Sequence, residues 1–547
     1  MLLNSRSNFS LLFIIIYSAI LLWGCASIQR PQGGPRDRTP PKLLKAFPAN
    51  KTRRFAAKQI QLDFDEYFKL SNPYSEISVS PAFEKAPEYI TKGRSLFIKL
   101  NDSLAKNTTY VFNFGKALAD VNESNVLKNF TYVLSTGDQI DSLSITGKVN
   151  NTLTAQPEKE VTVMIFPASR DTAFFGKKKP AIYTTTDSSG NFALNNLHEG
   201  EYTIYALKET SPDKIYNNDA ELIAFQKNTI NLKSDVTGIE LNLFKQVPDK
   251  FRVSSKKFDN DGKISLVFNK PLSNPSIKVN SPIEFENQKI VEFNKTRDSS
   301  TIFFRKMDFD ELKLQINDNG QFVDTIILRK GKNESFKRNL ALAYNINIDN
   351  KLRPGSDLLM TASFPLETYD ISKIKLLEDS IPVNNLAISK DPNNLRKLIL
   401  KYRWKQNTRY ELSLAEEALT DIYGDKNKEL TKRFLVDKPE NYGTLTLKVS
   451  VPDTSKFYIV EVLDSKKVVM QADVISKNSS VVYKNFFTGK YTIRVTYDIN
   501  KNRKADSGNV RTKSYAEKVW YNDKEFTLRP NWEMEETLII PKEESTP

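Results

Sequence analysis

Cysteine and histidine are almost absent from this chain of 547 residues. Cys25 is the single cysteine, so no disulfide can form within the chain and no thiolate cluster can bind a metal. His198 is the single histidine, which excludes a zinc site with two histidine ligands. A Ser-His-Asp triad would have to be built around that one residue. The sequence therefore excludes most of the catalytic chemistry that depends on these side chains.

Long apolar runs are also absent, with one exception near the start. Residues 11–23 (LLFIIIYSAILLW) carry no charge and follow a single basic residue, Arg6. A membrane-spanning helix needs about 20 apolar residues, so we interpret this run as the core of a secretory signal. Leu22-Trp23-Gly24-Cys25 resembles the lipobox of bacterial lipoproteins. The resemblance implies cleavage before Cys25, acyl chains on its sulfur and a membrane as the partner of the mature chain.

Charge is unbalanced but dispersed. The net charge is +14, and the basic residues are spread along the chain. The chain has the signal of an exported protein and no nucleic-acid-binding motif, so we expect no nucleic-acid partner. Anionic lipid headgroups or polyanionic envelope glycans are the neighbours that this charge favours.

Sustained helical periodicity is absent after the signal, and short alternating patterns take its place. Residues 25–39 are rich in Pro, Gly and Arg, which predicts a lipidated, flexible tether. Beyond it, Ile60, Leu62 and Phe64 alternate with polar residues, and similar runs recur between Asn, Pro, Gly and Ser. This pattern predicts an all-β chain of tandem antiparallel β-sandwiches.

Two kinds of unit are repeated. The first kind contains Lys106–Phe112 (KNTTYVF) and, 300 residues later, Gln406–Leu412 (QNTRYEL). Part of it recurs at Ile264–Phe268, so we count three copies, the middle one degenerate. The second kind contains Asn195–Ile204 (NNLHEGEYTI) and Lys484–Ile493 (KNFFTGKYTI). We expect a tight turn with positive φ at Gly200 or Gly489, followed at once by a strand.

The repeats define the domain organisation that we predict. We name the units A copies and B copies, and they follow one another in the order A, B, A, A, B. The predicted segments are a signal peptide (1–24), the tether (25–39), A copies at 40–138, 247–340 (degenerate) and 341–440, B copies at 139–246 and 441–541, and a tail (542–547).

The A copies resemble a known family. Thr39–Asn50 (TPPKLLKAFPAN), Leu62–Glu66, Asn107–Tyr110 and Tyr132–Gly137 together look like the bacterial Ig-like domain of the S-layer-protein type. This domain stands at the front of many lipoproteins of Bacteroidetes-type bacteria. The B copies are similar to the carboxypeptidase-regulatory or transthyretin-like sandwich, a module without catalytic residues. The resemblance implies a fold and a location but no particular task.

One loop has a spacing that suggests a metal. Asp498, Asn500, Asn502 and Asp506 occupy positions 1, 3, 5 and 9, the spacing by which oxygen ligands wrap calcium. Arg503 stands where an EF-hand has glycine, and Asn509 stands where it has glutamate. A looser version, Glu209, Ser211, Asp213 and Asn217, follows the first B copy's strand. The alternative is a hairpin loop closed by Asn and Asp side chains without any metal.

Other polar residues are interpreted as structural. His198 lies in a predicted turn and should face solvent. Asp63 and Asp65 alternate with apolar residues on a strand, which favours a solvated outer face over acid-base catalysis.

These features together predict a non-catalytic envelope lipoprotein that presents binding or scaffolding surfaces to an envelope protein or glycan. The alternative is a cell-envelope degradative enzyme or its glycan-binding accessory protein, which would need a pocket with convergent carboxylates. We expect the chain at the outer membrane of a bacterial envelope. The residues after Cys25 lack an acidic run, which favours the periplasmic face.

Overall fold

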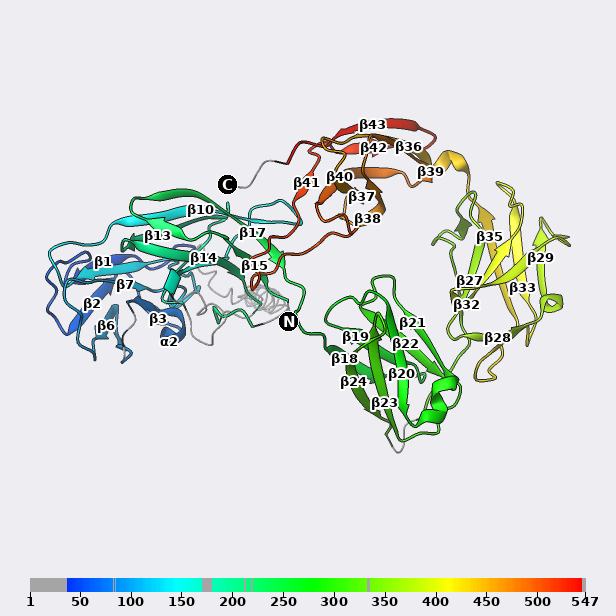
Figure 1. Cartoon of the computed structure of the whole chain (residues 1–547), viewed down its shortest axis with the longest axis horizontal. Helices are drawn as coiled ribbons and strands as arrows, with labels where there is room; N and C mark the ends of the chain where they lie inside the picture. Colours follow the sequence, from blue (N-terminus) through cyan, green and yellow to red (C-terminus); the bar gives the residue numbers. More distant parts are fainter. Residues whose placement is uncertain are drawn as a thin grey trace, which may run out of the picture. The chain divides into compact units, whose positions relative to one another are not determined.

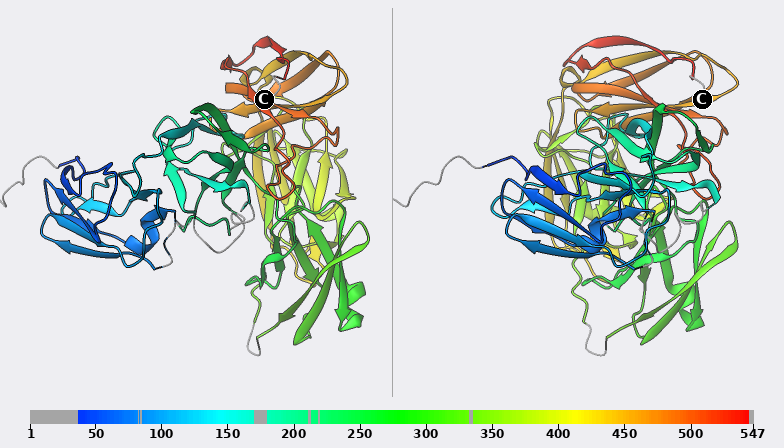
Figure 2. Two further views of the ribbon diagram at one scale, coloured as in Figure 1. Left: turned by 60° about the vertical axis from the view of Figure 1, so that its left-hand side comes forward. Right: turned by 90° about the vertical axis from the view of Figure 1, so that its left-hand side faces the viewer.

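The computed structural model describes residues 37–81, 83, 85–169, 180–210, 213–217, 220–331 and 335–543. In this part of the chain helix is confined to α2 (Pro73–Glu76) and short 3-10 turns, and strands form the rest of the regular structure (Figures 1 and 2). No helix of the described part is long and apolar enough to cross a membrane. The predicted all-β fold of tandem sandwiches is confirmed. Cys25 and residues 1–36 lie outside the described residues.

The chain divides between Asp141 and Ser142 into two compact units. The first unit holds a sheet of order β1-β2-β6-β5, a second of order β4-β7-β9 and the pair β3–β8. Ile60 pairs with Ile98 and Leu62 with Leu96, and all four side chains are buried between the sheets. The strands are β1 (Leu43–Phe47), β2 (Gln59–Phe64), β3 (Phe68–Leu70), β4 (Ser78–Ser80), β5 (Glu88–Lys92), β6 (Ser95–Lys99), β7 (Thr109–Asn113), β8 (Leu118–Asp120) and β9 (Thr131–Ser135).

Residues 253–329 of the second unit repeat this arrangement in reduced form. The sheets have the orders β18-β19-β22-β21 and β20-β23-β24, and no counterpart of the pair β3–β8 occurs among the strands described there. The missing pair agrees with the degenerate sequence. The elements are β18 (Val253–Phe258), β19 (Ile264–Phe268), β20 (Pro275–Ser281), η2 (Ile283–Gln288), β21 (Lys289–Phe293), β22 (Ser299–Phe304), β23 (Glu311–Asp318) and β24 (Gln321–Arg329).

Residues 342–436 repeat the arrangement in full. The sheets have the orders β25-β27-β32-β31 and β26-β35-β33-β29-β30, and the pair β28–β34 corresponds to β3–β8. The elements are β25 (Leu342–Tyr344), β26 (Lys351–Leu352), β27 (Leu358–Ala362), β28 (Leu366–Tyr369), η3 (Ile371–Lys373), β29 (Ile374–Glu378), β30 (Ile381–Pro382), β31 (Ala387–Asp391), β32 (Asn394–Lys401), β33 (Arg409–Leu414), β34 (Leu419–Asp421) and β35 (Leu430–Val436).

The matched A-copy sequences fold alike in atomic detail. Asn107 and Asn407 both have positive φ, of 50° and 52°. Three residues later, Tyr110 accepts a hydrogen bond from the Ala105 N–H at 2.9 Å. Tyr410 accepts one from the Lys405 N–H at 2.8 Å. The repeat detected in the sequence is therefore a repeat of local structure.

The two B copies share a strand order with one difference. In the first, β15 pairs with β17 and joins all strands into one sheet of order β12-β11-β14-β15-β17-β10-β13, with β16 on β14. The second forms β39-β36-β43 and β38-β37-β40-β41, with β42 on β40. First and last strands pair in parallel in both copies, β10 with β17 and β36 with β43. We predicted antiparallel pairing throughout. These two pairs differ from the prediction, because the first and last strands of each B copy run in the same direction and lie next to each other.

Among the described residues, each B copy consists of eight strands, and the second is preceded by a 3-10 turn. The first copy has β10 (Leu143–Asn151), β11 (Thr162–Pro167), β12 (Ile182–Thr185), β13 (Asn191–Leu197), β14 (Gly200–Lys208), β15 (Leu222–Phe225), β16 (Ile230–Leu232) and β17 (Val236–Lys245). The second has η4 (Pro439–Asn441), β36 (Gly443–Ser450), β37 (Phe457–Asp464), β38 (Val469–Ile475), β39 (Ser479–Phe486), β40 (Gly489–Asp498), β41 (Val519–Tyr521), β42 (Phe526–Leu528) and β43 (Glu533–Ile539).

The turn before β14 and β40 corrects one expectation. The prediction of positive φ was wrong for Gly200 and right for Gly489, whose φ is 155°. The left-handed residue in both copies is instead the asparagine four residues earlier, Asn196 at 56° and Asn485 at 49°. Asparagine tolerates this region because its short polar side chain can bond to the local backbone.

Candidate functional site in the loop after β40

Asp498 lies where strand β40 ends and the loop with the predicted calcium ligands begins. Asp498 is the last residue of β40 and pairs with Phe457 of β37. Its side chain is fully buried. The carboxylate accepts hydrogen bonds from the N–H groups of Asn502 at 3.1 Å and Arg503 at 2.7 Å. Asp498 thus folds the first turn of the loop back onto the end of the strand.

Asn500 and Asn502 both contact Asp506. Its Oδ2 accepts hydrogen bonds from the side-chain amides of Asn500 and of Asn502, the latter at 2.6 Å. The amide oxygens accept from the backbone as well: Asn500 from the Asn502 N–H at 3.0 Å, and Asn502 from the Lys504 N–H at 2.8 Å. The four predicted residues therefore lie together at the end of β40 and in the loop that follows, where hydrogen bonds connect their polar groups to one another and to the backbone.

Glu517 belongs to the same loop and was missed in the sequence. Its carboxylate accepts hydrogen bonds from the N–H groups of Ile499 and Asp506, both at 3.0 Å. Burial raises the pKa of Glu517, the nearby Asp506 and Asp498 raise it further, and the two backbone bonds oppose the shift. The signal that could have revealed it is a lone acidic residue just before the apolar strand β41.

Arg503 has the backbone conformation that glycine would favour. Its φ is 65°, in the left-handed region, at the position where an EF-hand loop has glycine. Its guanidinium lies over the ring of Phe457, 5.7 Å from the centroid. The arginine therefore takes the backbone shape that such a loop needs while its charge packs on an aromatic ring.

A metal in this loop stays a prediction. Within the described residues, no group of three or more His, Cys, Asp or Glu side chains is arranged to hold a metal ion. The predicted set differs from such a group, because it consists of two carboxylates and two amides. Oxygen ligands of this kind suit calcium, whereas the hydrogen bonds above suit a metal-free hairpin loop.

The corresponding loop of the first B copy is built differently. Glu209 accepts hydrogen bonds from the Lys214 N–H and, at 3.1 Å, from the Thr162 hydroxyl. Burial raises the pKa of Glu209 against these bonds. Asp213 accepts from the Asn217 side-chain amide at 2.7 Å, and Ser211 lies outside the described residues. Here the acidic residues fix a turn without converging on one carboxylate.

The remaining predicted residues occupy structural positions. His198 is exposed, and its carbonyl oxygen accepts the Tyr202 hydroxyl at 3.0 Å. Asp63 accepts hydrogen bonds from Ser95 at 2.6 Å and Gln61 at 2.9 Å, which lower its pKa. Asp65 caps the Lys42 N–H at 2.7 Å. The carboxylates of Asp63 and Asp65 therefore each have a structural explanation.

Comparison with known proteins identifies one domain type. Residues 37–136 match the family model of the bacterial Ig-like domain, which confirms the predicted resemblance for this part of the chain. No curated protein matches the chain. The resemblance of the B copies to transthyretin-like sandwiches stays a prediction.

The chain also matches solved structures of bacterial proteins. BcpA, the major pilin subunit of Bacillus cereus, is 11% identical over 73% of this chain and 99% of its own, with a TM-score of 0.14. The Bacillus anthracis TIE protein is 10% identical over 93% of this chain and 75% of its own, with a TM-score of 0.14. A DUF3823 family protein from Bacteroides uniformis is 9% identical over 40% and 88%, with a TM-score of 0.12. Similarity at this level carries no functional argument.

Proposed function

We propose that the protein is a lipid-anchored bacterial envelope protein that acts by binding or scaffolding and not by catalysis. The observation that carries the proposal is the order of segments: an apolar signal, a lipobox-like cysteine, a short tether and a bacterial Ig-like domain at residues 37–136. Lipid on Cys25 would attach this row of sandwiches to the membrane. The outer membrane and its periplasmic face are part of the proposal.

The anchor follows from the chemistry of acylation. Each buried CH₂ of an acyl chain contributes about 0.8 kcal/mol, and two chains are enough for stable attachment. The tether of residues 25–39 can extend at most about 54 Å, at 3.3 to 3.6 Å per residue. The first sandwich would then stay close to the bilayer surface, where its partner should be found.

The non-catalytic role is supported by the use of polar side chains. The acidic residues that could have formed a catalytic pair, Asp63 and Asp65, cap backbone or side-chain donors of their own sandwich. Two acids of the B copies, the half-buried Glu209 and the buried Asp498, hold the turns that follow their strands. An envelope protein or a glycan is the partner class that we propose.

The anchor is tested by replacing its acceptor. In cells fed an alkyne fatty acid, the wild-type chain should take up label and sediment with membranes, because the sulfur of Cys25 carries the lipid. Cys25→Ser should lose both properties, whereas the neighbouring change Ser27→Ala should keep them. Normal labelling and membrane retention of Cys25→Ser would contradict the proposal. Proteolysis of intact cells then separates the periplasmic face, where the chain is protected, from the outer surface.

A further inference from the structure

The connection between β40 and β41 leaves its own sandwich and contacts the first B copy (Figure 1). Val510, in the middle of this connection, is fully buried. It packs in an apolar cluster otherwise made by β11, β12, β14, β15 and β17. The other buried members of this cluster are Met164, Phe166, Tyr183, Tyr205, Leu207, Ile223, Phe225 and Phe244. A residue of the second B copy therefore completes a core that belongs to the first.

Gly508 allows the loop to approach this closely. A Cβ at this position would lie 2.6 Å from the ring of Phe244 and 2.8 Å from the backbone nitrogen of Ala516. Carbon and nitrogen atoms do not approach to such distances without displacement, so any side chain here would lift the loop. The glycine is thus fitted to the surface of the first B copy.

Polar contacts fix the position of the loop. The Val510 N–H donates to Oε1 of Gln246 at 2.9 Å, and Gln246 is itself buried. The side chain of Asn509 donates to Asp249 at 3.0 Å, and Arg511 forms an ion pair with the same carboxylate at 3.2 Å. A buried polar group without a partner is costly, so Gln246 needs the loop that covers it.

Aromatic contacts extend the interface. The ring of Tyr515 stacks on Phe225 with centroids 5.0 Å apart, and its hydroxyl accepts the Lys227 N–H at 2.8 Å. The ammonium of Lys513 donates to the Tyr205 hydroxyl at 2.5 Å and lies 4.6 Å from the centre of that ring. Stacking and cation–π contacts of this kind stabilise the interface beyond the free energy gained by burying apolar area.

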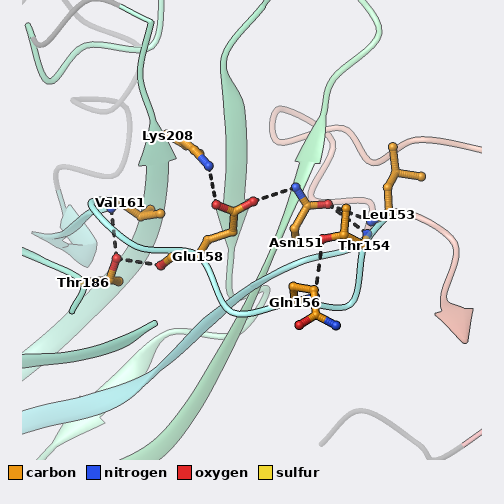
Figure 3. Close-up of polar contacts among 8 residues, drawn as sticks. All are labelled: Asn151, Leu153, Thr154, Gln156, Glu158, Val161, Thr186 and Lys208. Carbon is orange, nitrogen blue, oxygen red and sulfur yellow. Dashed lines mark hydrogen bonds and ion pairs between the residues drawn. The ribbon is translucent and has the colours of Figure 1, made fainter. Parts of the chain in front are cut away.

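A separate contact lies at the turn between β10 and β11. The Tyr521 hydroxyl donates to the carbonyl oxygen of Leu153. Figure 3 shows how this turn is held: Asn151 accepts the Leu153 N–H at 2.9 Å and donates to Glu158 at 2.9 Å. Glu158 also pairs with Lys208 of β14. The acceptor is therefore part of a fixed turn of the first B copy.

We propose that residues 507–515 are a docking loop whose partner is the apolar face of the first B copy in the same chain. Without the loop, Phe225, Phe244 and their neighbours would form an exposed apolar patch, which soluble domains avoid. The loop joins the first and the second B copy through contacts between residues about 260 positions apart in sequence. The intervening residues 250–440 are then a segment held at both ends.

The test measures proximity across this contact. In a full chain with Cys25→Ser, Lys227→Cys and Ser514→Cys place thiols on exposed residues whose side chains make none of the contacts above. A short bismaleimide should cross-link them within one molecule, which changes the mobility of the denatured chain. Val510→Asp should slow cross-linking at least tenfold, because it places a charge in the apolar cluster. Tyr515→Ala should slow it severalfold, and Lys504→Ala, outside the interface, should leave it unchanged.

Circular dichroism separates undocking from misfolding. Val510→Asp and Tyr515→Ala should retain the β-sheet spectrum of the parent. Equal cross-linking in the parent, Val510→Asp and Tyr515→Ala would overturn the proposal, as would an absence of cross-linking in the parent. Cross-linking only between molecules would also overturn it, since the partner face would then belong to a second copy of the chain.

Discussion

The first B copy and the second B copy have the same framework and different loops. Both have an asparagine with left-handed backbone conformation before β14 or β40. In both, the hydroxyl of the following tyrosine donates to a carbonyl four residues earlier, at 3.0 Å for Tyr202 and 2.7 Å for Tyr491. The loops after these strands differ: in the first copy Glu209 accepts the Lys214 N–H, and in the second the loop contacts the first copy. The two copies therefore share the local structure before and within these strands, and they differ in the loops that follow.

Packing inside the framework has also diverged. Ile145-Thr-Gly-Lys-Val149 and Leu445-Thr-Leu-Lys-Val449 are the corresponding stretches of β10 and β36. Gly147 pairs with Phe192, whose ring occupies the space beside it, whereas Leu447 pairs with the smaller Val481. The two copies fill one layer of the core with opposite combinations of large and small residues.

The largest expected effect comes from exchanging this packing. A Cβ at Gly147 would lie 2.1 Å from the carbonyl oxygen of Ile239, so Gly147→Leu should destabilise the first B copy by about 3 kcal/mol. Leu447→Gly should destabilise the second by about 3 to 5 kcal/mol through a cavity. Hydrogen exchange of β10 and β36 measures the two effects separately. Unchanged protection in Gly147→Leu would mean that the copies are interchangeable at this layer.

A smaller effect should distinguish the loop after β40 from the loop after β14. If Asp498, Asn500, Asn502 and Asp506 hold calcium, ten times the Kd of calcium should stabilise the second B copy by about 1.4 kcal/mol. Asp498→Ala should remove the gain, whereas Glu209→Ala should leave it intact. Hydrogen exchange of β40 in calcium and in chelator measures it. Identical exchange in both solutions would establish the metal-free hairpin.

The shared tyrosines should have nearly equal effects. Tyr202→Phe and Tyr491→Phe each remove one hydroxyl bond to a backbone carbonyl, of His198 and Phe487 respectively. Each change should lower the stability of its own copy by about 1 kcal/mol, the usual net value of such a bond. Chemical denaturation followed by hydrogen exchange checks both. If only one of the two variants lost stability, the tyrosine hydroxyl bond of the other copy would contribute nothing to stability.

The smallest effect concerns matched acids of the A copies and depends on pH. Burial raises the pKa of Asp120, but hydrogen bonds from the N–H groups of Asn125, Glu123 and Ser124 outweigh it and leave the pKa below 3.8. Burial raises the pKa of Asp421 above 3.8, against hydrogen bonds from the backbone of Tyr423 and Asp425. Among the residues that the structure describes, one oxygen of Asp421 has no hydrogen-bond partner.

These shifts have opposite consequences. A depressed pKa contributes stability that is present above the unfolded value and lost as the pH falls through the folded one. Asp120→Asn should therefore destabilise the chain at neutral pH and lose its effect in acid. A raised pKa contributes stability only below the unfolded value, and it is lost as the pH rises through the folded one. Asp421→Asn should therefore stabilise the chain at neutral pH. Melting curves at pH 3 to 7 would contradict this account if both variants changed in the same direction.

Much of the fold could be predicted because strands and turns leave local signatures. The alternation of apolar and polar residues predicts that Ile60, Leu62 and Phe64 are buried, which the structure confirms. The repeated sequence around Asn107 and Asn407 predicts a shared local structure, and both residues have positive φ. The parallel pairing of β10 with β17 could not be predicted, since alternation fixes the faces of a strand and not its neighbour. Gly200 was misjudged because asparagine, four residues earlier, can take the same left-handed conformation.

The candidate site could be predicted only in part. Regular spacing revealed Asp498, Asn500, Asn502 and Asp506, because they follow one another within a single loop. Glu517 lies after a long connection and joins them only through folding. Val510 and Gly508 carry no signal at all, since their partners are about 260 residues away. Contacts between residues far apart in sequence depend on the tertiary arrangement of the domains between them, and a local sequence pattern does not predict that arrangement.

The central claim is that this chain is an envelope lipoprotein anchored through Cys25. Mass spectrometry of the amino-terminal peptide of the mature protein, isolated from membranes, tests it most directly. The account predicts that the peptide begins at Cys25 and carries a diacylglyceryl group on its sulfur. A mature protein that retains residues 1–24, or one with an unmodified Cys25, would contradict the claim.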